Sequence, residues 1–254
     1  MYVACSTLCF ARYPLDQALR VIGELDFSKV DVAIHEKGPH LKPSEVAEDV
    51  SGASQRIRIG PRLSPAAFSV EIEAQGEEFI RQLRAICRLA RLSNVATVTL
   101  PAAASPAASV DAEVERLKRL VHLAQAEGVI LCLETRIGTL TEIPSVAVEL
   151  CERVPGLALT LDPSHFLAGP HQGQNYDVVF PFVRHVHLRD SGRSMDKFQV
   201  RVGQGEVEYG RIIAQLARHH YERLLTVEIL DVADAPFAVD HEVRKLKYLL
   251  ESLV

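Results

Sequence analysis

The 254-residue sequence lacks tryptophan, and aromatic residues make up only 6% of it. This removes the usual indole platform for stacking against a ligand, although it does not exclude ligand binding. No run of about 18 apolar residues occurs, which excludes a membrane-spanning helix. The stretch MYVACSTLCF at the N-terminus is not a basic leader followed by a long apolar segment. We therefore expect a soluble, cytoplasmic protein with no membrane partner.

A basic excess is also missing. The 28 basic and 33 acidic residues give a formal charge of -5, which argues against a nucleic-acid partner and favours a small polar substrate. The 5 cysteines include no Cys-x-x-Cys pair and lie in apolar surroundings. We interpret them as reduced core residues rather than as disulfides or catalytic thiols.

Apolar, β-branched runs alternate with amphipathic stretches about thirty residues apart, the size of a βα unit. The predicted strands are Tyr2–Leu8, Lys29–Ile34, Arg56–Ile59, Asn94–Leu100, Val129–Glu134, Leu157–Leu161, His185–Leu188 and Leu224–Ile229. The predicted helices include Pro14–Leu25, Gly76–Leu92, Ala112–Glu127 and Tyr209–His219. Ser93-Asn94, Glu127-Gly128 and Pro155-Gly156 mark returns from helix to strand.

The strands are continuous apolar runs, as expected for parallel strands covered on both faces. Eight such units favour a closed (β/α)₈ TIM barrel over a doubly wound sheet, and no GxGxxG follows the first strand. No linker separates two halves of the chain, so we expect one α/β domain over residues 1–254.

Ionisable residues stand at the ends of four strands in the second half of the chain. They are Glu134, Asp162 with His165, His187 with Asp190, and Glu228. Because a β/α barrel gathers its active site at the carboxyl ends of its strands, these residues should converge. Three carboxylates and an imidazole form an oxygen-rich, thiolate-free set that suits Mn²⁺, Mg²⁺ or Co²⁺, with Zn²⁺ not excluded.

Each of these residues also has a structural alternative. For Glu134 the alternative is an ion pair with Arg136 or with an arginine of a neighbouring loop, and Asp162 before Pro163 is a typical helix N-cap. His185 and His187 lie on the same side of a strand, and one of them is expected to be a core histidine. His35, Glu36 and His40 follow the second strand and are interpreted as solvated loop residues, with pocket lining as the alternative.

With these motifs in place, the chain resembles the xylose-isomerase-like TIM-barrel family. The combination of strand-end Glu134, the DxxH of Asp162–His165, HVHLRD and strand-end Glu228 carries the resemblance. It implies that Glu134, Asp162, His187 and Glu228 hold one divalent ion, Mn²⁺ first. It also implies that His165, Arg193, His185 and Asp190 contact substrate, with Asp190 alternatively orienting a loop. Members often form dimers or tetramers.

The resemblance implies a sugar or sugar-phosphate isomerase or epimerase in which Glu134 and Glu228 transfer a proton through a metal-stabilised enediolate. A dehydratase acting on inosose or 3-dehydroshikimate is the alternative. A sugar-binding barrel without turnover is disfavoured because all four ligands are intact. The apurinic endonucleases of the family carry extra histidines, whereas this chain has Leu100-Pro101 and Lys197-Phe198-Gln199 at the corresponding places. The long segment Ser191–Glu206 is predicted to shape the pocket.

Overall fold

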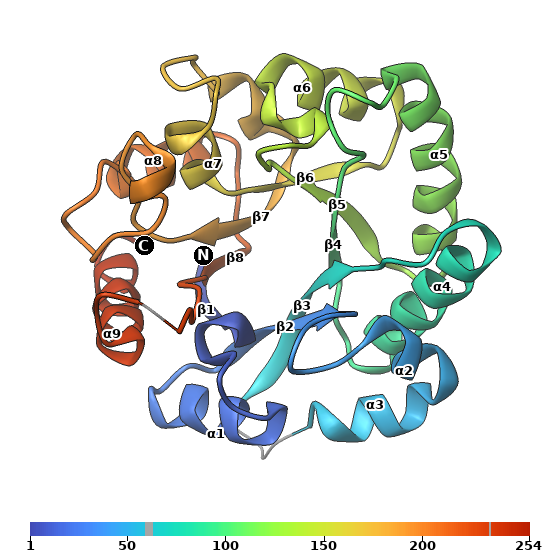
Figure 1. The fold of residues 1–254 in the computed structure, drawn as a ribbon, viewed down its shortest axis with the longest axis horizontal. Helices are drawn as coiled ribbons and strands as arrows, with labels where there is room; N and C mark the ends of the chain where they lie inside the picture. Colours follow the sequence, from blue (N-terminus) through green and yellow to red (C-terminus); the bar gives the residue numbers. More distant parts are fainter. Residues whose placement is uncertain (59–62, 234) are drawn as a thin grey trace.

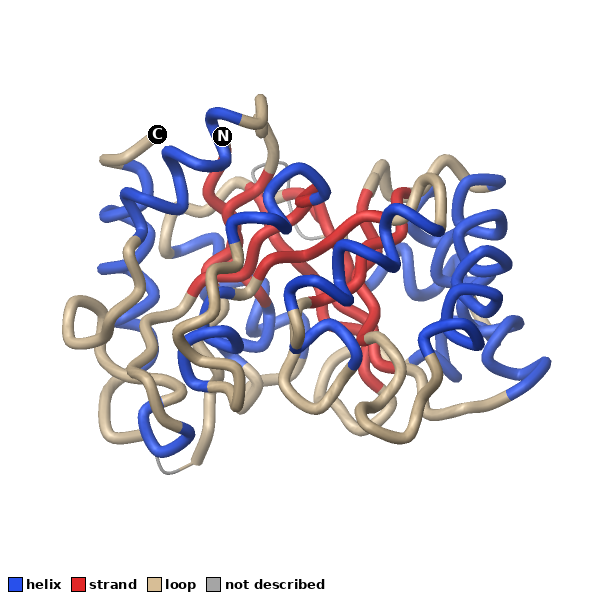
Figure 2. Tube along the Cα trace, turned by 90° about the horizontal axis from the view of Figure 1, so that it is seen from above, coloured by secondary structure: helices blue, strands red, loops and turns tan. Residues whose placement is uncertain are grey.

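The computed structural model describes residues 1–58, 63–233 and 235–254. Eight parallel strands close into a barrel in chain order, with β8 paired to β1, which confirms the predicted (β/α)₈ fold. The strands are β1 (Tyr2–Ser6), β2 (Lys29–His35), β3 (Ser64–Glu71), β4 (Thr97–Pro101), β5 (Ile130–Glu134), β6 (Ala158–Leu161), β7 (Val183–Leu188) and β8 (Leu224–Val227). Figure 1 shows them inside a ring of helices, and Figure 2 shows the same layering from the side.

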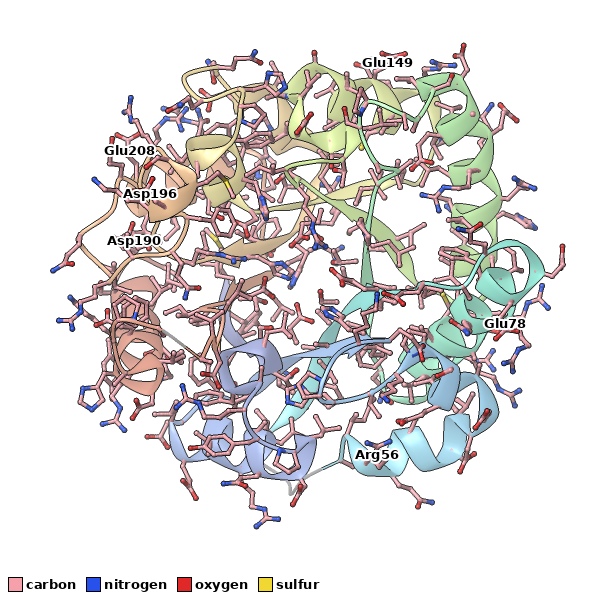
Figure 3. The ribbon with its side chains drawn as sticks, viewed as in Figure 1. Arg56, Glu78, Glu149, Asp190, Asp196 and Glu208 are labelled. Atoms are coloured by element: carbon pink, nitrogen blue, oxygen red, sulfur yellow. The ribbon has the colours of Figure 1, made fainter. Side chains whose placement is uncertain are left out.

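The longer helices cover the outside of the barrel because each has one apolar face. They are α1 (Leu15–Glu24), α2 (Pro43–Glu48), α3 (Val50–Arg56), α4 (Gly76–Leu92), α5 (Val110–Ala126), α6 (Pro144–Arg153), α7 (Pro163–Ala168), α8 (Tyr209–Arg218) and α9 (Val239–Glu251). In α4, Leu83, Ile86 and Leu89 are fully buried. Glu78 of α4, Glu149 of α6 and Arg56 of α3 lie instead at the periphery of the ring (Figure 3).

Short 3-10 helices add further turns at η1 (Thr7–Phe10), η2 (Leu140–Glu142), η3 (Asp177–Phe182) and η4 (Met195–Lys197). The three predicted returns to strand each contain one residue with a left-handed backbone. The φ angles are 55° at Asn94, 74° at Gly128 and 92° at Gly156. Glycine and asparagine adopt this conformation at the lowest cost, which explains why they occur at these turns.

One predicted strand is wrong. Arg56 ends helix α3, and the third strand is Ser64–Glu71. The end of the predicted strand, Ile59, lies outside the described residues. The short segment RIRI resembles a strand in composition, but it was too short to distinguish a strand from the end of a helix.

The buried apolar side chains form one core cluster that includes Cys5, Cys9, Cys87 and Cys151, and Cys132 is also free and buried. The prediction of reduced core thiols agrees with this placement. Figures 1 and 2 show the two ends of the chain close together, and α9, the last helix, packs against β1. Among the helices in the described parts of the chain, none is both long and apolar enough to cross a membrane.

Candidate metal centre and active site

Three strand ends bring Glu134, His187 and Glu228 together. Glu134 is the last residue of β5, His187 lies in β7, and Glu228 directly follows β8. The Nδ1 atom of His187 lies 2.9 Å from Oε1 of Glu134 and 3.5 Å from Oε1 of Glu228. One potential ligand atom from each residue lies within 4.8 Å of the others. Convergence of these three side chains at the carboxyl ends of the strands follows from the parallel barrel.

Asp162, which stands between β6 and α7, and His165, within α7, complete the cluster. Together with Glu134 they form a second group whose ligand atoms lie within 4.8 Å of one another. Asp162 also caps α7: its Oδ1 accepts hydrogen bonds from the backbone N–H of Ser164 at 2.9 Å and from its hydroxyl. Asp162 can therefore cap the helix and belong to the site at the same time, because capping uses Oδ1 and leaves Oδ2 facing the cluster.

Arg189 is a member of the site that the sequence analysis missed. Its Nη2 donates to Oδ2 of Asp162 at 2.7 Å and to Oε1 of Glu228 at 3.0 Å, and the residue is only 2% exposed. Its Nε and Nη1 have no hydrogen-bond partner among the described residues. The sequence contained a signal for Arg189. Residues 185, 187 and 189 are spaced two apart, and this spacing places the side chains of a strand on one face.

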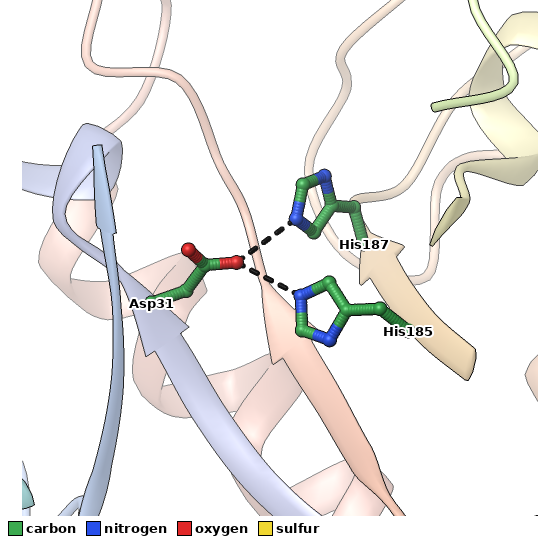
Figure 4. A group of neighbouring side chains, drawn as sticks. All are labelled: Asp31, His185 and His187. Atoms are coloured by element: carbon green, nitrogen blue, oxygen red, sulfur yellow. Dashed lines mark hydrogen bonds and ion pairs between the residues drawn. The ribbon is translucent and has the colours of Figure 1, made fainter. Parts of the chain in front are cut away.

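Asp31 is the second residue that was missed. It lies in the middle of β2, fully buried, and its Oδ2 accepts hydrogen bonds from Nε2 of His185 at 2.8 Å and of His187 at 3.0 Å (Figure 4). Since β2 and β7 are not neighbours in the sheet, these contacts cross the barrel interior. An acidic residue between Val30 and Val32 was the available signal, because an unpaired charge in such a strand is costly.

Above the cluster, a cleft of about 350 Å³ opens between the loops at the carboxyl ends of the strands. Its lining residues are Leu8, His35, Ser69, Glu71, Glu134, Arg136, His165, Arg189, Phe198, Glu228 and Leu230. Arg136 forms an ion pair with Glu71 and lies 3.8 Å from Glu134. The predicted alternative partner of Glu134 is thus present, but His187 is closer.

The first-half loops contribute more than expected. His35 lines the cleft, and His40 is 3% exposed, with Nδ1 3.1 Å from the hydroxyl of Thr7. The interpretation of these two histidines as solvated loop residues is wrong, because β2 extends to His35 at the cleft and His40 packs against Thr7 of η1 and the backbone of Tyr13. Glu36 accepts hydrogen bonds from the backbone N–H and hydroxyl of Ser44.

The remaining predicted residues lie apart from the cleft. Arg193 forms an exposed ion pair with Glu206 and does not line the cleft, and His185 lies deeper in the barrel against Asp31. Asp190 accepts hydrogen bonds from the backbone N–H groups of Gly203 at 2.7 Å and Gly205 at 3.0 Å. It therefore organises the loop after β7, the alternative role expected for it.

That loop, residues 191–206, reaches the site through Phe198. The Phe198 ring lies 5.0 Å from the guanidinium carbon of Arg189 and 4.8 Å from the His165 ring. Next to it, Gln199 exchanges two hydrogen bonds with the backbone of Leu230. The loop is thus fixed to the segment after β8 and covers one side of the cluster.

Burial and neighbouring charge shift the pKa values of the cluster. Burial alone would raise the pKa of Glu134, but the hydrogen bond from His187 and the nearby cationic groups hold it well below its usual range. Burial raises the pKa of Glu228, despite the opposing effects of His187 and Arg189. Burial lowers the pKa of His165. Burial would also lower the pKa of His187, but the surrounding carboxylates raise it well above its ordinary value.

These residues fit a divalent cation. The two groups share Glu134, and together they offer three carboxylates and the imidazoles of His165 and His187, with no thiolate. Oε2 of Glu228 is buried without a hydrogen-bond partner among the described residues. Arg189 supplies one positive charge to Asp162 and Glu228, which leaves the cluster rich in negative charge. Buried charge of this kind is normally compensated by a metal or a cation.

Comparison with known proteins identifies relatives of this chain. No curated protein sequence gives a significant match. Among solved structures, IolI with a bound zinc atom has a TM-score of 0.76 at 16% identity, covering 100% of this chain and 98% of that one. The 3-keto-D-glucoside 4-epimerase YcjR from E. coli has a TM-score of 0.73 at 14% identity, covering 99% of each chain.

The probable 3-DHS dehydratase AsbF from Bacillus anthracis has a TM-score of 0.71 at 17% identity, covering 97% of this chain and 98% of that one. At these identities the similarity shows the fold. The family described as xylose isomerase-like TIM barrel matches residues 16–249, nearly the whole barrel. The chain therefore belongs to the xylose isomerase-like TIM-barrel family.

Proposed function

We propose that this protein is a divalent-metal-dependent isomerase or epimerase that acts on a sugar, a sugar phosphate or another polyhydroxy ketone. The observation that carries the proposal is the pair of buried glutamates, Glu134 and Glu228, which approach the same nitrogen of His187 from the ends of β5 and β8. Two carboxylates beside one cleft can remove a proton and return it. The structural relative YcjR is itself a sugar epimerase.

The ion would be held by Glu134, Asp162, His187 and Glu228. When bound, it supplies Lewis acidity that polarises a carbonyl oxygen and acidifies the neighbouring C–H bond. We propose Mn²⁺ first, because the donor set is rich in oxygen and contains no thiolate, and Mg²⁺, Co²⁺ and Zn²⁺ as alternatives.

The two glutamates would carry the proton. One of them takes the proton from the carbon next to the carbonyl, which leaves an enediolate. Return of the proton to the former carbonyl carbon, while the hydroxyl proton passes to the former carbonyl oxygen, isomerises the substrate. Return to the opposite face of the original carbon inverts that carbon. The second glutamate serves for the return when the two carboxylates lie on opposite faces of the substrate.

His165 is placed to orient the substrate. Its Nδ1 accepts a hydrogen bond from the backbone N–H of Ile137 at 3.2 Å. In the neutral ring, Nε2 then carries the proton and can donate it to a substrate hydroxyl. Phe198, Leu8 and Leu230 supply an apolar wall that limits the access of water to the reacting carbon.

A dehydratase acting on an acidic substrate is the second candidate. The observation that favours it is Arg189, whose Nε and Nη1 lack partners among the described residues although the residue lines the cleft. Together with Arg136 it offers two cationic groups that suit a carboxylate. AsbF, a structural relative, is a probable 3-DHS dehydratase.

The test is an NMR time course in D₂O with the Mn²⁺-loaded protein and a panel of ketoses, aldoses, their phosphates, inosose and 3-dehydroshikimate. Deuterium next to a carbonyl, together with new sugar signals, supports the isomerase or epimerase. New vinylic or aromatic signals support the dehydratase instead. Each assay is repeated with Glu134→Gln and with protein treated with a chelator. Turnover that survives both would contradict the proposal.

A further inference from the structure

Asp31 occupies an unusual position for a charged residue. It stands inside the barrel, fully buried, between Val30 and Val32 of β2. Its Oδ1 has no hydrogen-bond partner among the described residues, and its Oδ2 accepts from both His185 and His187. A buried carboxylate costs several kcal/mol unless it is paired, and an apolar residue would fill this layer at lower cost. Packing alone therefore does not explain Asp31.

The two nitrogens of His187 face different groups. Nε2 lies 3.0 Å from Oδ2 of Asp31, and Nδ1 lies 2.9 Å from Oε1 of Glu134. A neutral imidazole has one donor nitrogen and one acceptor nitrogen. When Nε2 donates to Asp31, the lone pair on Nδ1 points at the carboxylates of Glu134 and Glu228. A cation bound between Nδ1 of His187 and these two carboxylates would give all three groups a partner.

His185 holds Asp31 in place. Its Nε2 lies 2.8 Å from the same oxygen of Asp31 and 3.3 Å from the hydroxyl of Thr226. The rings of His185 and His187 meet edge to face, with centroids 4.9 Å apart (Figure 4). A chain of polar contacts thus runs from Thr226 through His185 and Asp31 to His187, and it ends at the candidate metal site.

We propose that Asp31 is a positioning residue for the metal centre. It fixes His187 in the tautomer with the proton on Nε2 and turns Nδ1 toward the ion, while His185 fixes the carboxylate of Asp31. A histidine that binds a metal through one ring nitrogen commonly donates a hydrogen bond from the N–H of the other nitrogen to a carboxylate. The inference rests on the metal site of the proposed function, but not on the identity of the substrate.

The first experiment measures His187 in the unmodified protein. Long-range ¹H–¹⁵N NMR of the histidine-labelled, Zn²⁺-loaded protein should show Nε2 of His187 protonated and Nδ1 bound to the ion. The reverse assignment would overturn the proposal without any variant, so this readout does not depend on how well a variant folds.

The second experiment compares variants. Asp31→Asn keeps the volume and removes the charge, and Mn²⁺ binding followed by calorimetry should weaken about 10- to 100-fold. The matched control is Asp231→Asn, which removes the charge of a side chain that is only 2% exposed and pairs with Arg12, away from both histidines. Its affinity for Mn²⁺ should stay within a factor of two of the unmodified protein, about 0.4 kcal/mol.

Three outcomes oppose the proposal, and each one identifies what fails. Unchanged Mn²⁺ affinity in Asp31→Asn overturns the positioning role alone. Two ions per chain by elemental analysis, one of them lost in Asp31→Asn, would make Asp31, His185 and His187 a second metal site, since their ligand atoms also lie within 4.8 Å of one another. Failure of the unmodified protein to bind any divalent ion overturns this inference together with the proposed function.

Discussion

The two halves of the barrel contribute to the site in different ways. Strands β5 to β8 place Glu134, Asp162, His187 and Glu228 at or next to their carboxyl ends, where the cleft opens. Strand β2 of the first half places Asp31 in the middle of the strand, below the cleft. The four residues at the strand ends can therefore contact a ligand in the cleft. Asp31 lies deeper along its strand and is expected to act through another side chain.

The rim shows the same division. His35 and Glu71 end β2 and β3 in the first half, and both line the cleft without joining the candidate ligand set. Glu71 instead forms an ion pair with Arg136, just beyond β5. The second half therefore carries the candidate chemistry, and the first half supports and lines it. Substitutions in the second half should therefore have larger effects on turnover and stability than substitutions in the first half.

The largest effect is expected for Glu134→Gln in the second half. The change keeps the volume and removes the base, so the turnover rate should fall by about 10²- to 10⁴-fold with the fold retained. Turnover is followed by NMR and folding by circular dichroism. Glu206→Gln, on the exposed ion pair with Arg193, is the control and should leave turnover unchanged. Equal rates for the two variants would exclude Glu134 as the base.

Arg189→Met tests the charge balance of the second half. It leaves Asp162 and Glu228 buried without their cationic partner, so unfolding in urea without metal should require about 3–5 kcal/mol less free energy. Added Mn²⁺ should recover part of this loss. Arg193→Met breaks an exposed pair instead and should change stability by no more than about 0.5 kcal/mol. A similar loss in both variants would show that Arg189 has no special role.

Glu71→Gln probes the first half and should have a smaller effect. The ion pair between Glu71 and Arg136 is more than one-third exposed on both sides, so its loss is worth at most about 1 kcal/mol. We expect KM to change no more than about fivefold and kcat to stay the same. Steady-state kinetics on the substrate identified by NMR will check this. A collapse of kcat would move Glu71 into the chemical step.

The smallest difference between the halves is expected for the cysteine thiols, which should resist labelling equally in both halves. Burial raises the pKa of Cys87, Cys132 and Cys151 to about 12. These thiols therefore stay protonated at pH 8, and a thiol reagent should label them only after unfolding. Because the unfolded thiols ionise near pH 8.5, stability should fall as the pH rises from there toward 12. Rapid labelling of Cys87 alone in the native protein would show that the first half opens more easily.

Much of this architecture follows from local sequence patterns. Apolar runs and amphipathic stretches predicted eight strands, and the bounds Gly76–Leu92 match α4. The residues at the strand ends were identifiable because a polar residue closing an apolar run is a local signal. The third strand was misplaced because RIRI, which begins at the end of α3, resembles a short strand in composition and precedes the actual strand by only a few residues. Arg193 was assigned by the family resemblance, but a resemblance within a long loop does not fix where a side chain points.

The barrel, its parallel strands and the side chains that close the second-half strands could be predicted from the residue pattern, because periodicity and strand order are properties of the linear chain. The contacts of Asp31 with His185 and His187, and the bridge from Arg189 to Asp162 and Glu228, became evident only in the folded protein. These contacts join residues far apart in the sequence across a closed barrel. The closure brings them together, and the cost of leaving a buried charge unpaired holds them there.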